Sequence, residues 1–129
     1  MRAFNEEDLM GKYTQCFYRR LTHPSRGDSY IVWRRGTGDN VELLHLYSIG
    51  DGWGLRLLCQ MLEVLQHTPP YATVFGFTRA GNAKARAFYE RTGFTLTEVA
   101  GVYDEGRAVV FSARYDELCR LHLRNADNV

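Results

Sequence analysis

Apolar residues in the N-terminal part of the chain recur at helical spacing. Between Asn5 and His23 they stand every four positions, at Leu9, Tyr13, Phe17 and Leu21. This spacing places them on one face of a helix. Asn5 followed by three acidic residues is typical of a helix start, because its side chain can cap the first turn and the acids face the positive helix end. The pattern therefore predicts a helix from Asn5 to about Leu21, which the polar segment 23–28 ends.

The rest of the chain predicts alternating strands and helices. Alternating and β-branched residues predict a hairpin of strands 30–33 and 41–48, joined by a turn over 36–40. The next helix carries its apolar residues at helical spacing and ends near Thr68; these residues are Leu57, Leu58, Met61, Leu62 and Leu65. A strand over 72–78, a helix over 82–92, strands over 94–99 and 107–114, and a last helix over 116–123 follow.

This order of elements indicates a mixed α/β fold. The central strand–helix–strand unit requires a right-handed crossover and hence a parallel strand pair. The hairpins on either side of it make the other pairs antiparallel. We expect a mixed, mostly antiparallel sheet with a central parallel strand pair and helices on both faces. The 129 residues form one domain, in which residues 124–129 are a frayed tail.

Composition narrows the class of protein. Hydrophobic residues make up 45% and the formal net charge is +1, so neither a nucleic-acid partner nor a membrane partner is indicated. No apolar run is long enough to span a membrane and the first residues do not resemble a signal peptide, so we expect a cytoplasmic protein. Three cysteines without a CxxC pair are expected to be buried reduced thiols, rather than a nucleophile or metal ligand. The four histidines lack metal-ligand spacing, and no metal site is predicted.

Alternating glycines connect a predicted strand to a predicted helix. Gly50, Gly52 and Gly54 leave main-chain N–H groups unobstructed at the positive end of that helix, where an anion can bind. Glycines at this position can also serve only a tight turn. A P-loop would need Gly-Lys-Ser/Thr, which is absent, and the spacing does not fit the dinucleotide fingerprint of a Rossmann fold.

Two segments resemble the GCN5-related N-acetyltransferase (GNAT) superfamily. Residues 49–58, IGDGWGLRLL, are similar to its acetyl-CoA loop, Arg/Gln-Gly-x-Gly-x-Gly/Ala-x-x-Leu-Leu. Ile49 departs from this pattern, since Arg or Gln is usual at the first place. Trp53 replaces an aliphatic residue and is assigned to packing. Residues 82–94, NAKARAFYERTGF, resemble the family's N-x-x-A-x-x-F-Y-x-x-x-G-F at every fixed place.

The resemblance implies a site for acetyl-CoA, with CoA as a product. Its loop amides would hold the pyrophosphate, the end of the preceding strand would pair with the pantetheine arm, and Asn82 would lie beside that arm. Arg86 would either approach a cofactor phosphate or remain a solvated charge. The residues expected to contact the cofactor are Leu46, Tyr47, Ser48, Ile49, Gly50, Asp51, Gly52, Trp53, Gly54, Leu55, Asn82, Arg86 and Tyr89.

The resemblance also implies catalytic roles. Tyr89 would lie near the sulfur, where a phenol that is protonated at neutral pH can donate to a departing thiolate; the alternative is a core aromatic. An amine nucleophile must lose a proton, and Glu42 on the strand before the loop is the candidate base. Simple alternation places Glu42, Leu44 and Leu46 on one face and His45 on the other. A β-bulge, common in this strand of the family, would change that assignment and keeps His45 possible.

The predicted activity is N-acetylation of a primary amine by direct attack on acetyl-CoA in a ternary complex. The acceptor is a protein lysine, a protein N-terminus or a small molecule. The N-terminal third is shorter than in the usual fold, which begins with a strand and two helices, and these elements normally shape the acceptor pocket. Since Ile49 replaces the loop's basic residue, the alternative is a catalytically inactive GNAT-like module that binds a macromolecule with or without CoA. The family also makes a homodimer possible.

Overall fold

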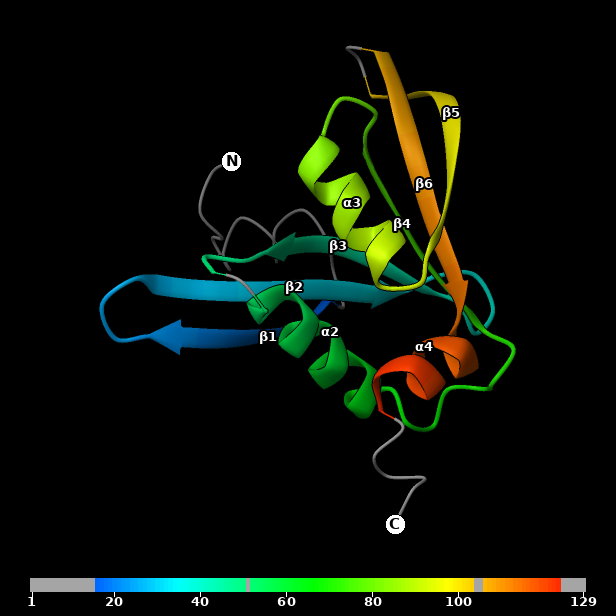
Figure 1. Cartoon of the computed structure of the whole chain (residues 1–129). Coiled ribbons are helices and arrows are strands. Elements are labelled where there is room, and N and C mark those ends of the chain that lie inside the picture. The colour runs from blue at the N-terminus through cyan, green and yellow to red at the C-terminus, as the bar shows by residue number, and fades with distance from the viewer. Residues whose placement is uncertain (1–15, 51, 104–105, 124–129) are drawn as a thin grey trace.

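The computed structural model describes residues 16–50, 52–103 and 106–123 (Figure 1). A single six-stranded sheet has the strand order β1-β2-β3-β4-β6-β5. Its strands are β1 (Cys16–His23), β2 (Gly27–Arg35), β3 (Val41–Tyr47), β4 (Thr73–Arg79), β5 (Thr95–Tyr103) and β6 (Gly106–Arg114). The helices are α2 (Trp53–Val64), α3 (Ala83–Arg91) and α4 (Tyr115–His122). The pair β3–β4 is parallel and the other neighbouring pairs are antiparallel, as the sequence predicted.

The predicted N-terminal helix is wrong over Cys16–His23. These residues form β1, which pairs with β2 from Cys16 opposite Arg34 to His23 opposite Gly27. Phe17 stacks on Trp33 of β2, with ring centroids 6.1 Å apart. The four-residue apolar spacing also fits a strand that contributes only some of its side chains to the core, and pairing along the whole of β2 outweighs the local helical pattern. Residues 5–15 of the predicted helix lie outside the described residues.

One hydrophobic core joins the helices to the sheet. The apolar stripe of α2 is fully buried, at Leu57, Leu58, Met61 and Leu62. It packs with Ile31 of β2, Tyr89 of α3 and Leu118 of α4 in a single cluster. The three described helices therefore cover the same face of the sheet, as Figure 1 shows. The sequence predicted helices on both faces of the sheet; a helix on the second face is not among the described residues, and that part stays a prediction.

Strands β3 and β4 are paired over only a short distance. Val41 lies opposite Val74 and Glu42 opposite Phe75, and no later pair joins the two strands within the described residues. Beyond these pairs β3 continues to Tyr47 and β4 to Arg79, and the strands run apart (Figure 1). Because each strand carries main-chain N–H and C=O groups on both edges, their separation leaves polar main-chain groups on the inner edge of β3.

Gly76 lies where the separation begins. A Cβ atom there would be 2.5 Å from the main-chain oxygen of Leu43 and would also clash with the ring of Phe111. Gly76 pairs with Phe111 across the β4–β6 ladder, and the buried Phe111 ring is stacked on Tyr89, so it has little room to move. Only glycine therefore allows β3, β4 and the Phe111 ring to approach one another this closely.

We expect Gly76→Ala to lower the free energy of unfolding by about 1–3 kcal/mol, because the added methyl group forces main chain and a buried ring apart. Urea denaturation measures the change. Gly81→Ala is the matched control, since nothing lies within 4 Å of its added Cβ, and it should change stability by less than about 0.5 kcal/mol. Equal stability of the two variants would contradict the close approach at Gly76.

Candidate active site

The glycine loop between β3 and α2 is anchored by the first residues of β2 and by its own side chains. Ser29, which is fully buried, accepts a hydrogen bond from the main-chain N–H of Ile49 at 2.9 Å. Ser48 Oγ donates to the carbonyl oxygen of Gly50 at 2.6 Å. Asp51 lies outside the described residues. The amide of Ile49 is thus occupied by Ser29, and the amide of Trp53 donates to the carbonyl oxygen of Gly50 at 3.4 Å.

Gly52 and Gly54 of the loop are required for different physical reasons. Gly52 is the N-cap of α2 with φ of 81°, a left-handed conformation that favours glycine. The amide of Arg56 donates to the carbonyl of Gly52 at 3.1 Å and begins the regular helical hydrogen bonds. The N–H groups of Gly54 and Leu55 precede that bond, so they point out of the N-terminus of α2. A Cβ on Gly54 would lie 3.1 Å from the ring of Phe88, which shows how closely α2 and α3 approach.

Residues distant in sequence surround the loop. Arg26, in the turn between β1 and β2, donates from Nη2 to the carbonyl oxygen of Ile49 at 2.7 Å. The rings of His23 and Trp53 lie 5.6 Å apart, and the guanidinium of Arg56 lies 5.6 Å from the centre of the Trp53 ring. Trp53 therefore packs against these two side chains, and its contact with a cofactor stays a prediction. Neither Arg26 nor Ser29 was identified from the sequence, because residues 23–28 were interpreted only as the end of a helix.

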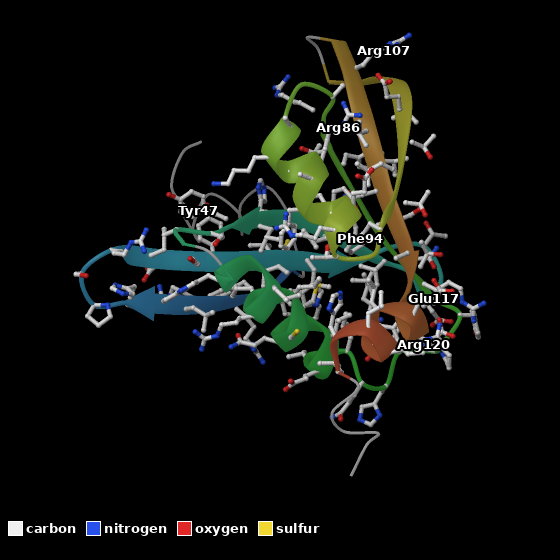
Figure 2. All side chains as sticks on the ribbon, viewed as in Figure 1. Tyr47, Arg86, Phe94, Arg107, Glu117 and Arg120 are labelled. Carbon is white, nitrogen blue, oxygen red and sulfur yellow. The ribbon has the colours of Figure 1, made fainter. Side chains whose placement is uncertain are left out.

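The second motif forms the predicted capped helix. Asn82 Oδ1 accepts a hydrogen bond from the amide of Ala85 at 3.1 Å and caps α3. Gly93 has φ of 107° just beyond the helix and ends it. Arg86 donates from Nη1 to the carbonyl of Ala80 at 2.8 Å, and Figure 2 shows its side chain on α3. The helix limits are confirmed, and the expected roles of Asn82 and Arg86 toward a cofactor stay predictions.

Tyr89 is packed in an aromatic cluster near the separating strands. Its ring stacks on Phe111 with centroids 3.6 Å apart and meets Phe88 and Phe94 edge-on. The residue is only 6% exposed. Since the Phe111 ring lies against Gly76, Tyr89 lies one ring away from the point where β3 and β4 part. Tyr89 thus packs in the core, and a role for its hydroxyl stays a prediction.

A bulge in β3 changes the predicted faces of that strand. Val32 of β2 lies opposite His45, whereas the next residue, Trp33, lies opposite Leu43, so Leu44 has no cross-strand partner. The expected bulge is confirmed, and the simple alternation is wrong beyond Leu43. His45 is thereby brought to the face of Glu42, and Leu46 packs against the helix-side core.

Both candidate bases, Glu42 and His45, lie on the face of the sheet opposite the three helices. Glu42 is bound by Arg34 of the neighbouring strand, whose Nε and Nη2 lie 3.0 and 2.9 Å from its Oε1. Its side chain is 17% exposed. Glu42 is the last residue of β3 that pairs with β4, so it marks the closed end of the strand separation, and His45 lies beyond it.

The cysteines do not form disulfides and are half-buried. Burial raises the pKa of the Cys59 thiol, and the charge of Glu63 raises it further. Burial also raises the pKa of Cys16, although Arg34 partly offsets the effect. Within the described part of the chain, no three His, Cys, Asp or Glu side chains are arranged to hold a metal ion. No helix of this part has the length and apolarity to cross a membrane.

Comparisons identify the fold. No family model matches the sequence, and no curated protein does. The structure is similar to the ribosomal-protein-S18-alanine N-acetyltransferase from Escherichia coli, with 21% identity over 87% of this chain and 77% of that one and a TM-score of 0.67. A putative streptothricin acetyltransferase from Bacillus anthracis in complex with acetyl coenzyme A is 15% identical over 88% of this chain and 69% of that one, with a TM-score of 0.68.

Spermidine N-acetyltransferase from Vibrio cholerae is similar over 87% of this chain and 75% of that one, at 12% identity and a TM-score of 0.67. A putative acetyltransferase of the GNAT family from Desulfovibrio desulfuricans is 17% identical over 84% of this chain and 75% of that one, with a TM-score of 0.68. At these identities the similarity concerns the fold. The chain has the fold of the GNAT-family acetyltransferases.

Proposed function

We propose that this protein is an N-acetyltransferase that transfers the acetyl group of acetyl-CoA to a primary amine by direct attack in a ternary complex. The observation that carries the proposal is the separation of β3 from β4 directly before the glycine loop. One acetyl-CoA molecule could then place its pyrophosphate at the N-terminus of α2 and its extended pantetheine arm along the edge of β3 that faces the separation. Neighbours of the same fold carry acetyl coenzyme A or coenzyme A, which supports this ligand.

The chain offers residues that fit both parts of the cofactor. The outward amides of Gly54 and Leu55, together with the positive end of α2, suit the pyrophosphate. Leu46 and Tyr47 lie on the stretch of β3 that no longer pairs with β4, and Ser48 directly follows it. Their main-chain groups can bind the pantetheine amides as a further strand would. Figure 2 shows Tyr47 at the end of β3. Asn82 caps the helix that carries Tyr89, so the second motif borders the same separation.

Acetyl-CoA supplies a thioester, and the chemistry exchanges its C–S bond for a C–N bond to the acceptor. The chain must then do three things. The amides near Leu46 to Ser48 stabilise the negative charge that develops on the acyl oxygen. The Tyr89 hydroxyl donates its proton to the departing sulfur, and Glu42 or His45 accepts the proton that the amine loses, directly or through water. Positioning both substrates contributes much of the rate enhancement. No covalent bond to the protein is needed.

The acceptor is a primary amine on a protein or on a small molecule. Related folds act on both kinds: one neighbour is named for the alanine of ribosomal protein S18 and another for spermidine. The strand face that bears Glu42 and His45 is the side from which an acceptor would reach the separation between β3 and β4. A homodimer stays possible.

Saturating acetyl-CoA should raise the melting temperature. A ligand at about one hundred times its dissociation constant adds about 2.7 kcal/mol to the free energy of unfolding, or roughly 10 °C for a chain of this size. Differential scanning calorimetry with acetyl-CoA and CoA measures the shift, and NADH is the control that shares the adenine and diphosphate groups. Absence of a shift with either CoA compound would reject the proposal and favour a binding module that works without this cofactor.

Tyr89→Phe should lower kcat by about 10²–10⁴-fold and leave the affinity for acetyl-CoA unchanged, because the ring packing is kept and only the proton donor is lost. Steady-state kinetics with an amine acceptor, together with calorimetric titration of acetyl-CoA, separate the two effects. Tyr71→Phe removes the hydroxyl of a side chain that is 66% exposed and should retain full activity. Unchanged kcat in Tyr89→Phe would leave the residue as a core aromatic only.

The pH dependence of kcat/KM should identify the base. A base acts when deprotonated, so kcat/KM rises with pH through its pKa, and removal of the base flattens that limb. Glu42→Gln keeps an oxygen toward Arg34, and His45→Gln replaces an exposed side chain. We expect one of these variants to lose about 10²-fold in kcat/KM and to lose the rising limb, while the other retains it. Wild-type profiles in both variants would contradict a base on this face of β3.

A further inference from the structure

A basic side chain reaches the glycine loop from the turn between β1 and β2. The guanidinium of Arg26 donates from Nη2 to the carbonyl oxygen of Ile49 at 2.7 Å. A Cβ on Gly50 would lie only 3.2 Å from Nη1 of the same guanidinium. Glycine at position 50 therefore leaves room for Arg26 to lie against the loop. The side chain is bound to the residue at which the GNAT-like loop pattern has Arg or Gln and this chain has isoleucine.

The turn that carries Arg26 is held against the loop by further contacts. The main-chain amide of Arg26 donates a hydrogen bond to the carbonyl oxygen of His23 at 3.3 Å and closes the turn. The amide of Ser25 donates to Nδ1 of His23 at 3.2 Å and fixes the imidazole. The centre of the imidazole ring lies 5.6 Å from the centre of the Trp53 ring, and Trp53 is the first residue of α2. The His23–Trp53 contact before Arg26 and the hydrogen bond from Ile49 to Ser29 after it thus join this hairpin to the loop and to α2.

Two arginine side chains lie at this end of α2. Arg26 and Arg56 lie beside the loop, and within residues 16–50, 52–103 and 106–123 no carboxylate forms an ion pair with either. The first turn of α2 contains no acidic residue. Cations at the positive end of a helix are unfavourable by themselves and become favourable when an anion binds between them. One N–H of Arg26 is used by Ile49, and the exposed guanidinium has further N–H groups to donate.

We propose that Arg26 binds the diphosphate of the CoA substrate and takes the place of the basic side chain missing at Ile49. This inference rests on the proposed function, since it concerns the same cofactor. The guanidinium approaches the loop from β1–β2 instead of from the loop itself, and its hydrogen bond to the Ile49 carbonyl fixes its position. A diphosphate fits this place because it offers anionic oxygens to the guanidinium and to the outward amides of α2 at once.

The test compares the affinities of Arg26 variants for CoA and for pantetheine, which lacks phosphate, by isothermal titration calorimetry. Arg26→Ala should weaken CoA binding about 10- to 100-fold, as expected for hydrogen bonds to a charged group. Its affinity for pantetheine should be unchanged. Arg26→Gln, which keeps an amide donor for the Ile49 carbonyl but no charge, should lose nearly as much. Both variants should bind CoA with a weaker dependence on salt than the wild type.

A second substitution and a control sharpen the result. Ile49→Arg in the Arg26→Ala background should restore most of the lost CoA affinity, because it returns a guanidinium to the loop. Arg19→Ala is the matched control: Arg19 is also exposed, on β1, and its guanidinium donates a hydrogen bond to the main-chain oxygen of Tyr18. It should bind CoA like the wild type.

The outcomes separate the two proposals. Wild-type protein that binds CoA, with an Arg26→Ala variant that binds it equally well, overturns the role of Arg26 and leaves the acetyltransferase proposal in place. Equal losses for CoA and pantetheine, with a lower melting temperature, also overturn it, because Arg26 would then only maintain the loop. Wild-type protein that does not bind CoA overturns both.

Discussion

The parallel contact between β3 and β4 is the constraint on which the rest of the site depends. Two residue pairs hold these strands together at one end, and at the next position Gly76 brings the Leu43 carbonyl, the β4 main chain and the Phe111 ring into contact. The strands diverge from this point. The stacked pair of Phe111 and Tyr89 then connects the closed end of the separation to α3. Main-chain groups of β3 are thus made available in the middle of the sheet, and not only at its outer strands β1 and β5.

The sequence predicted the central helices correctly because their limits and buried faces depend on residues that are close in the chain. Asn82 can cap a helix and Gly93 can end one, and both do so with the expected geometry. The fully buried stripe of α2 likewise follows from its spacing. These features depend on residues within a few positions of one another. The choice of side of the sheet for Glu42 and His45 depended instead on one unpaired residue, Leu44, which no periodicity reveals.

The failures concern interactions between distant segments. Cys16–His23 carries a spacing that a helix and a strand can both satisfy, and the partner strand β2 decides between them. Because this hairpin was not predicted, its turn could not be expected over the glycine loop. Arg26 and Ile49 are 23 positions apart, and Ser29 is another loop contact that only strand pairing brings into place. Sequence patterns therefore identified the glycines that form the loop, but not Arg26 and Ser29, which bind it from the β1–β2 hairpin.

The contact of Gly54 with Phe88 has a consequence for how such a sequence can change. A methyl group at position 54 would lie 3.1 Å from the Phe88 ring, so alanine there requires the ring to yield by a few tenths of an ångström. Phe88 also meets Tyr89 edge-on, which limits how far it can yield. Among homologous chains, positions 54 and 88 should therefore covary, with the smallest residue at one accompanying the large ring at the other. The N-terminus of α2 and the helix that carries Tyr89 would then evolve as a pair.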